Sequence, residues 1–160
     1  METVFFERTG NIRREKKFLE GKLNVKLNIV GKKITLEGDA LEEYEARIVL
    51  EAISFGFSAK VSIILKDPEV SFREIPIRDF TRKKNLESVR ARLIGKHGRT
   101  KSTIEGISDC KIIIRDNAVG IIGSANEIEH AITAITNLIK GSKQSNVYHY
   151  LEKINRDKNK

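Results

Sequence analysis

The residues best suited to chemistry lie in one short stretch, Gly95-Lys96-His97-Gly98. Two glycines three positions apart let the backbone approach a ligand without side-chain bulk. The lysine and histidine between them offer positive charge and hydrogen-bond donors. Arg99 and Lys101 follow in what reads as the first turn of a helix. Because a helix start presents free backbone N–H groups and a positive dipole end, the stretch predicts a phosphate site.

The elements next to this turn supply further candidate contacts. Arg92 lies on the helix before the turn, and Ile94 and Ile113 would border an apolar groove for bases, whereas Ile104 fits the core better. The neighbouring strand adds two more cations. The complete set of predicted nucleic-acid-binding residues is Arg92, Ile94, Gly95, Lys96, His97, Gly98, Arg99, Lys101, Lys111, Ile113 and Arg115.

The net charge of +8 is concentrated near the turn. Residues 1–80 contain 14 basic and 14 acidic residues, whereas residues 81–160 contain 16 and 8. Residues 82–101 alone hold eight basic residues against the single acid Glu87. An ordinary solvated basic surface is the plainer interpretation. Convergence of the charge on a glycine turn favours a polyanion site.

Catalysis is not indicated by the sequence. The three histidines, His97, His130 and His149, lack the spacing of a metal site, and Cys110 is the only cysteine. No lysine–serine pair follows the glycines, which disfavours nucleotide hydrolysis. We therefore expect no enzyme activity, no metal and no cofactor, and we expect Cys110 to be a small core residue.

The sequence contains an internal repeat, and the turn lies at the start of its second copy. Shifting the sequence by 85 positions aligns residues 10–53 with 95–138 without a gap, and 11 of the 44 pairs are identical. The identical pairs include Gly10/Gly95, Arg14/Arg99, Glu20/Glu105, Gly38/Gly123 and Ala46/Ala131. Matching glycines and matching apolar periodicity together indicate two copies of one small unit.

Each copy has the same predicted plan. The expected elements of the second copy are a strand at 71–78, helices at 82–94 and 99–107, strands at 110–115 and 118–122, and a helix at 125–140. Those of the first are a helix at 11–20, strands at 24–30 and 33–37, a helix at 41–54 and a short helix at 58–66. Gly38 and Gly123 are expected to end the second strand, and Ser124 with Glu127 predicts a capping box.

The first copy departs from the second at the turn. Arg13 stands where the second glycine should be, which blocks close backbone approach. Before Gly10 there is room for a strand at 4–6 or, alternatively, a helix at 2–9, and we favour the strand. We therefore predict two domains: residues 1–67, degenerate and without the glycine turn, and residues 68–160, with the turn and a C-terminal helix.

The C-terminal region predicts a docked helix with a basic tail. Val147, Tyr150, Leu151 and Ile154 share a helical face. The cations of the tail, Lys153, Arg156, Lys158 and Lys160, fit RNA contact and a solvated terminus equally well. No apolar run reaches the length of a membrane span and the N-terminus does not read as a signal peptide, so a cytoplasmic location is expected.

The turn, with Leu93 and Ile94 before it and Thr103-Ile104-Glu105 and the strand 110–114 after it, resembles the core of a KH domain, whose GXXG loop clamps about four single-stranded nucleotides. The chain is similar to the archaeal KH-domain small-subunit ribosome-assembly factors, relatives of the partner-of-Nob family. The resemblance to this family also rests on residues 53–58, 77–80 and 146–152. The resemblance implies an α+β fold of two tandem type I KH-like domains, each a three-stranded antiparallel sheet covered by helices, the first truncated. It also implies binding of single-stranded pre-rRNA near the 3′ end of the small-subunit RNA, alongside the Nob endonuclease.

Two other functions fit the residues. One is a general single-stranded RNA or DNA binder in RNA decay or translational control. The other is a protein-interaction scaffold with an incidental basic patch. RNA affinity that disappears when the turn is mutated would exclude the scaffold.

Overall fold

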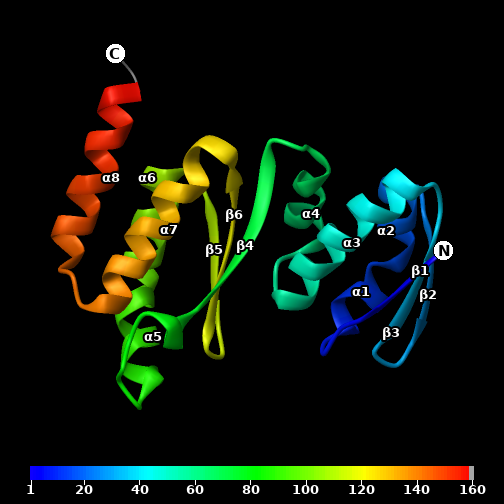
Figure 1. Ribbon diagram of the computed structural model, residues 1–160, viewed down its shortest axis with the longest axis horizontal. Coiled ribbons are helices and arrows are strands. Elements are labelled where there is room, and N and C mark those ends of the chain that lie inside the picture. Colours follow the sequence, from blue (N-terminus) through cyan, green and yellow to red (C-terminus); the bar gives the residue numbers. More distant parts are fainter. Residues whose placement is uncertain (159–160) are drawn as a thin grey trace. The chain divides into compact units, whose positions relative to one another are not determined.

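The chain folds into two compact units, one ending at Val70 and the other beginning at Ser71. The structure is a computed structural model that describes residues 1–158 (Figure 1). The division lies three residues beyond the boundary expected from the sequence. Each unit contains one three-stranded sheet and several helices, so both have an α+β architecture.

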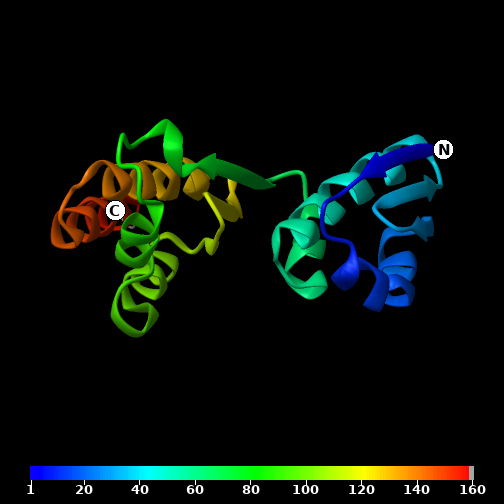
Figure 2. The same cartoon turned by 90° about the horizontal axis from the view of Figure 1, so that it is seen from below.

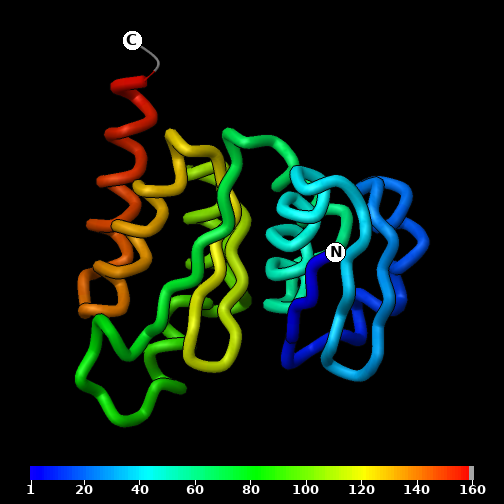
Figure 3. Tube along the Cα trace, turned by 45° about the vertical axis from the view of Figure 1, so that its right-hand side comes forward, coloured from blue at the N-terminus to red at the C-terminus, as the bar shows by residue number. Residues whose placement is uncertain are grey.

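The first unit begins with a strand, as the sequence analysis favoured, and the alternative prediction of a helix at 2–9 is wrong. Its elements are β1 (Glu2–Phe5), α1 (Gly10–Arg14), α2 (Lys16–Leu23), β2 (Lys26–Val30), β3 (Lys33–Glu37), α3 (Ala40–Phe55), α4 (Ala59–Ser62) and a 3-10 turn (Ile63–Lys66). Both outer strands pair antiparallel with β3, in the order β1-β3-β2 (Figure 3). Alternation along the strands buries Leu27, Ile34 and Leu36 against the helices.

The second unit carries the predicted turn. Its elements are β4 (Val70–Pro76), a 3-10 turn (Ile77–Asp79), α5 (Leu86–Ile94), a 3-10 turn (Lys96–Gly98), α6 (Arg99–Ser108), β5 (Lys111–Arg115), β6 (Ala118–Ser124), α7 (Ala125–Lys140) and α8 (Gln144–Lys158). The sheet order is β4-β6-β5, and β5 and β6 form an antiparallel hairpin. Figures 1 and 2 show α6 and α7 on the same face of this sheet.

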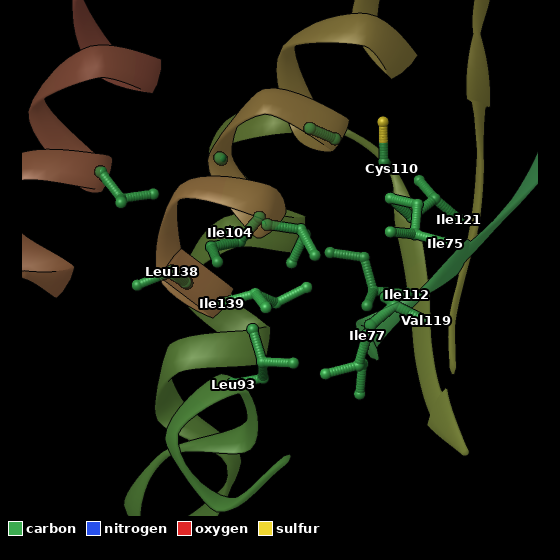
Figure 4. Packing of buried hydrophobic residues seen from close by; sticks show 14 of the residues in the cluster. Ile75, Ile77, Leu93, Ile104, Cys110, Ile112, Val119, Ile121, Leu138 and Ile139 are labelled. Carbon is green, nitrogen blue, oxygen red and sulfur yellow. The ribbon is translucent and has the colours of Figure 1, made fainter. Parts of the chain in front are cut away.

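One apolar core holds the second unit together (Figure 4). The sheet contributes Ile112, Val119 and Ile121, and the helices contribute Leu93 and Ile104, each at most 1% exposed. Burying a side chain of this size contributes about 1.5–3 kcal/mol. Leu93 lies in the last turn of α5 and Ile104 lies in α6, so the core fixes both helices that flank the glycine turn.

Matching contacts recur in the two units. The carboxylate of Glu20 accepts a hydrogen bond from Leu27 N (2.8 Å), and that of Glu105 accepts one from Ile112 N (2.9 Å). Asn24 and Asp109, each closing the helix that carries this glutamate, both adopt the left-handed conformation with φ 57°. The pairs lie 85 positions apart, so the sequence repeat is also a repeat of local structure.

Replacing Glu105 by alanine should lower the free energy of unfolding of the second unit by about 1–3 kcal/mol, because the Ile112 N–H would lose its partner in a partly buried place. Urea unfolding followed by far-ultraviolet circular dichroism measures this change. Replacing Glu152, an exposed residue of α8, should change it by less than about 0.5 kcal/mol. Equal effects of the two substitutions would contradict the structural role of Glu105.

Two helix predictions need correction. The expected helix at 82–94 begins only at Leu86, because the Asn85 side chain accepts a hydrogen bond from Glu87 N and fixes the start there. The expected helix at 11–20 is two helices, α1 and α2, separated at Glu15, whose φ of −99° and ψ of 15° depart from helical values.

Two details of the second hairpin also differ from expectation. Gly123 does not end a strand, since β6 continues to Ser124. Glycine is required there because a Cβ would lie 2.4 Å from Cys110 Sγ. The capping box does not form: Ser124 precedes α7, but its side chain makes no capping bond, and Glu127 pairs with Lys158.

The predicted C-terminal helix is confirmed as α8, which packs on α6 and α7 through the buried Val147 and Leu151. Of the basic tail, Lys158 pairs with Glu127, Lys153 and Arg156 are exposed, and Lys160 lies outside the described residues.

Candidate nucleic-acid interface

The backbone of the Gly95–Gly98 turn runs through conformations that favour glycine. Gly95 has φ 76° and ψ 173°, His97 has φ 55° and ψ 28°, and Gly98 has φ 74° and ψ 13°. Gly95 N donates to Ala91 O (2.8 Å), and Gly98 N donates to Gly95 O (3.1 Å). The chain therefore ends α5, turns within three residues and starts α6.

The two glycines are required for different reasons. A Cβ on Gly95 would lie 2.2 Å from Thr100 Oγ1 and 2.7 Å from Thr100 N, so a side chain there collides with the start of α6. A Cβ on Gly98 would meet nothing within 4 Å. Gly95 is thus needed for the turn itself, whereas Gly98 leaves open space at its outer end.

The start of α6 offers an anion site. The preceding residue, Gly98, has no side chain to cap the helix, and the first turn holds no acid. Lys96, His97 and Arg99 are exposed, and within the described residues no hydrogen bond or ion pair occupies their side chains. Free backbone N–H groups beside unpaired cations suit a phosphate. Lys101 is less available, since its Nζ lies 3.4 Å from Glu105 Oε1.

Arg92 has a structural task that the sequence did not reveal. Its guanidinium donates to Leu138 O and Ser142 O, at the C-terminal end of α7. Leu138 lies in the last turn of α7 and Ser142 just beyond it, and a cation at this end complements the helix dipole. Arg92 thus fixes α5 against α7, and any contact it makes with RNA stays a prediction.

The apolar candidates separate clearly in the structure. Ile94, the last residue of α5, is 38% exposed beside the turn, and Ile104 is completely buried. Ile94 is thus partly accessible to solvent and Ile104 belongs to the core, as the sequence favoured, and a contact of Ile94 with a base stays a prediction.

The candidates on β5 lie on the sheet face that points away from the helices. Ile112 and Ile114 of this strand pack in the helix-covered core. Since side chains alternate along a strand, Lys111, Ile113 and Arg115 share the opposite face of the sheet. β5 is one of the two edge strands, but these three side chains lie on the face away from the helices that flank the turn, so their joint role stays a prediction.

One residue outside the predicted set also shapes the site. Arg90 Nη1 donates to Asp116 O (2.9 Å) and Asn117 Oδ1 (3.2 Å), joining α5 to the turn between β5 and β6. Its partners are 26 and 27 positions away in the chain. The sequence marks Arg90 as one of eight clustered cations but carries no signal for this pairing.

The equivalent place in the first unit is closed. Residues Gly10 to Arg13, which align with the glycine turn, form part of the helix α1. Ile12, which aligns with His97, is completely buried. A buried isoleucine in a regular helix offers no ligand the exposed backbone that the second unit presents.

Cys110 and possible metal-ligating side chains are the remaining candidates for chemistry. Burial raises the pKa of the Cys110 thiol to about 11, so the reactive thiolate is scarce at neutral pH. No three side chains of histidine, cysteine, aspartate or glutamate gather in the described part of the chain as a metal ion would need. No helix among residues 1–158 has the length and apolar character that crossing a bilayer requires.

Comparison with known proteins gives a consistent result. The family model of the second PNO1 KH domain, described as a eukaryotic type KH domain (type I), matches residues 71–156. A KH domain-containing protein of Methanocaldococcus jannaschii is 29% identical over 94% of this chain and 68% of its own length. An RNA-binding protein pno1 of Drosophila pseudoobscura is 32% identical over 83% of this chain. The chain spans 59% of the length of that relative.

A solved structure agrees with the sequence relatives. The Dim2p chain in a complex of a/eIF2alpha, aDim2p and rRNA from Pyrococcus horikoshii superposes with a TM-score of 0.86 at 30% identity. The match covers 98% of this chain and 94% of that one. Fungal relatives carry the name pre-rRNA-processing protein pno1.

Proposed function

The chain belongs to the PNO1 family of type I KH-domain proteins, and from this premise we propose that it is a small-subunit ribosome-assembly factor that clamps single-stranded pre-rRNA. The rRNA in the complex of the Pyrococcus relative supports the ligand class. The name of the fungal relatives supports a place in pre-rRNA processing.

The observation that carries the proposal is the open start of α6. The glycine turn exposes backbone N–H groups at the end of a helix without a side-chain cap, and Lys96, His97 and Arg99 beside it are exposed and unpaired within the described residues. In this proposal the phosphates of the RNA strand approach the open side of Gly98, and Lys96 and Arg99 add positive charge. Ile94 borders the bases, whereas Arg92 positions α5.

We assign unequal roles to the two halves. Residues 68–160 are the RNA-binding KH domain in this proposal, and residues 1–67 are a KH-like domain that has lost its clamp. The buried Ile12 and the zero net charge of residues 1–80 support the assignment. The first half would then serve structure or protein contact.

The remaining parts of the proposal follow the resemblance to the partner-of-Nob proteins. The bound segment would lie near the 3′ end of the small-subunit RNA. The Nob endonuclease and the precursor of the small subunit would be partners, and the protein would act in the cytoplasm as a non-enzymatic factor.

A salt titration tests the proposed clamp. If three or four phosphates are neutralised, log K for a short single-stranded RNA should fall with log salt at a slope of about −2 to −3, since each contact contributes about −0.7. Fluorescence anisotropy with a labelled RNA measures this slope. An affinity that does not change between low and high salt would rule out a phosphate clamp.

A further inference from the structure

A second basic surface lies on the unit that carries the glycine turn. We name it the corner surface, and it comprises two segments, the loop 80–85 before α5 and the junction 140–143 between α7 and α8. Its cations are Arg82, Lys83, Lys84, Lys140 and Lys143, and all five are exposed. Residues 80–86 and 138–151 contain no acid, and Asp79 and Glu87 lie just outside the loop.

The fold brings the two segments together. Lys140 Nζ lies 5.6 Å from the centre of the Phe80 ring, a distance at which a cation is attracted to the ring face. Phe80 in turn packs against the apolar core of the second unit. The loop and the junction, about 60 positions apart in the sequence, therefore form one surface.

Helix α5 connects this surface to the clamp. Arg92, one turn before Gly95, donates to Ser142 O, and Lys143 is the next residue. The loop with Arg82 to Lys84 leads into the other end of α5. With nine residues α5 is only about 13 Å long, so a strand held at its C-terminal end has few nucleotides to cross before it reaches the corner surface.

We propose that the corner surface binds the phosphates next to those held at the glycine turn, so that the second unit holds a longer stretch of one RNA strand than a clamp of about four nucleotides. This inference rests on the proposed function. An acidic protein is the less suitable partner, because none of the strongly exposed large apolar side chains belongs to the corner surface. Protein interfaces draw most of their energy from such anchors, whereas a phosphate backbone requires only charge.

The test compares two lengths of RNA on the full chain. Wild-type protein should bind a 12-nucleotide single strand more tightly than a 5-nucleotide strand. The variant with Arg82→Gln, Lys83→Gln, Lys84→Gln, Lys140→Gln and Lys143→Gln should bind the short strand normally. Its affinity for the long strand should fall about 10- to 100-fold at ~0.1 M salt, and the salt slope should flatten by about 2, for about three lost phosphate contacts.

Two further variants make the outcome decisive. A control that changes Lys16, Lys17, Lys26, Lys33 and Lys60 of the first unit to glutamine removes the same charge from exposed positions and should keep the length dependence. The smaller variant Lys83→Gln/Lys84→Gln/Lys143→Gln keeps the Lys140–Phe80 contact. It replaces the five-residue variant in the comparison of RNA lengths if that variant folds poorly.

An unchanged long-strand affinity would overturn the inference and leave an acidic protein as the partner to test. Equal losses in the variant and the control would also overturn it, because they would reflect net charge alone. Binding of the 5-nucleotide strand tests the clamp independently of the corner surface. If Lys96→Asp/His97→Asp does not weaken the binding of this short strand, the proposed function fails, whatever the comparison of the two RNA lengths gives.

Discussion

Replacing Lys96 and His97 by aspartate is expected to lower the affinity for a short single-stranded RNA at least about 100-fold, or about 2.7 kcal/mol. Both side chains are exposed at the turn and make no hydrogen bond or ion pair within the described residues, so the substitution removes little packing. Two carboxylates would instead repel the phosphate at the open start of α6, and like charges brought together cost several kcal/mol. Anisotropy titration measures the affinity, and circular dichroism checks the fold.

The repeat supplies a matched control for this variant. Asn11 and Arg13 are exposed on α1 and align with Lys96 and Gly98 of the second unit. The double change Asn11→Asp/Arg13→Asp alters the formal charge by −3, as Lys96→Asp/His97→Asp does. We expect it to leave RNA affinity within about threefold of the wild type. Comparable losses from the two variants would mean that the first unit binds RNA too.

The two glycines of the turn should respond differently to alanine. Gly95→Ala should lower the free energy of unfolding by more than about 2 kcal/mol, because φ 76° with ψ 173° is accessible almost only to glycine and a Cβ would lie 2.2 Å from Thr100 Oγ1. Gly98→Ala should cost only about 1–2 kcal/mol, the penalty of the left-handed conformation, because its Cβ would point into open space.

RNA binding separates the two glycines further. In the Gly98→Ala protein the fold should remain, yet the added Cβ occupies the space that a phosphate would enter, and affinity should fall about tenfold or more. Urea unfolding and anisotropy titration of both variants give the two quantities. If Gly98→Ala binds RNA as well as the wild type, the phosphate does not approach the turn from that side.

The sequence predicted most of the second unit because its signals are local. The three isoleucines within residues 110–115 and the apolar face of α7 indicate their elements directly, and both elements form. Two glycines around a lysine and a histidine indicated a backbone turn, and the 85-residue repeat reported the shared plan of the units. The turn and the strand and helix patterns depend on neighbours within a few positions, whereas the repeat emerges from comparing the two halves of the sequence.

The sequence also predicted how the first unit differs from the second. Arg13 in place of the second glycine predicted that the first unit has no clamp, because a clamp needs a backbone without a Cβ at that position. The sequence also predicted a helix in this segment, but not which of its side chains would be buried. The tertiary structure decided that point, because Ile12 of α1 packs into the core of the first unit.

The roles of individual cations depended on the tertiary structure. Arg92 and Arg99 look alike in the sequence, yet Arg92 binds carbonyls 46 and 50 positions away and Arg99 faces solvent. Likewise, Lys140 and Phe80 meet only because α7 ends beside the loop that precedes α5. The amino-acid sequence determined the charge, the glycines and the repeat. Only the packing of helices distant in the chain decided which cations stabilise the fold and which stay available to a phosphate.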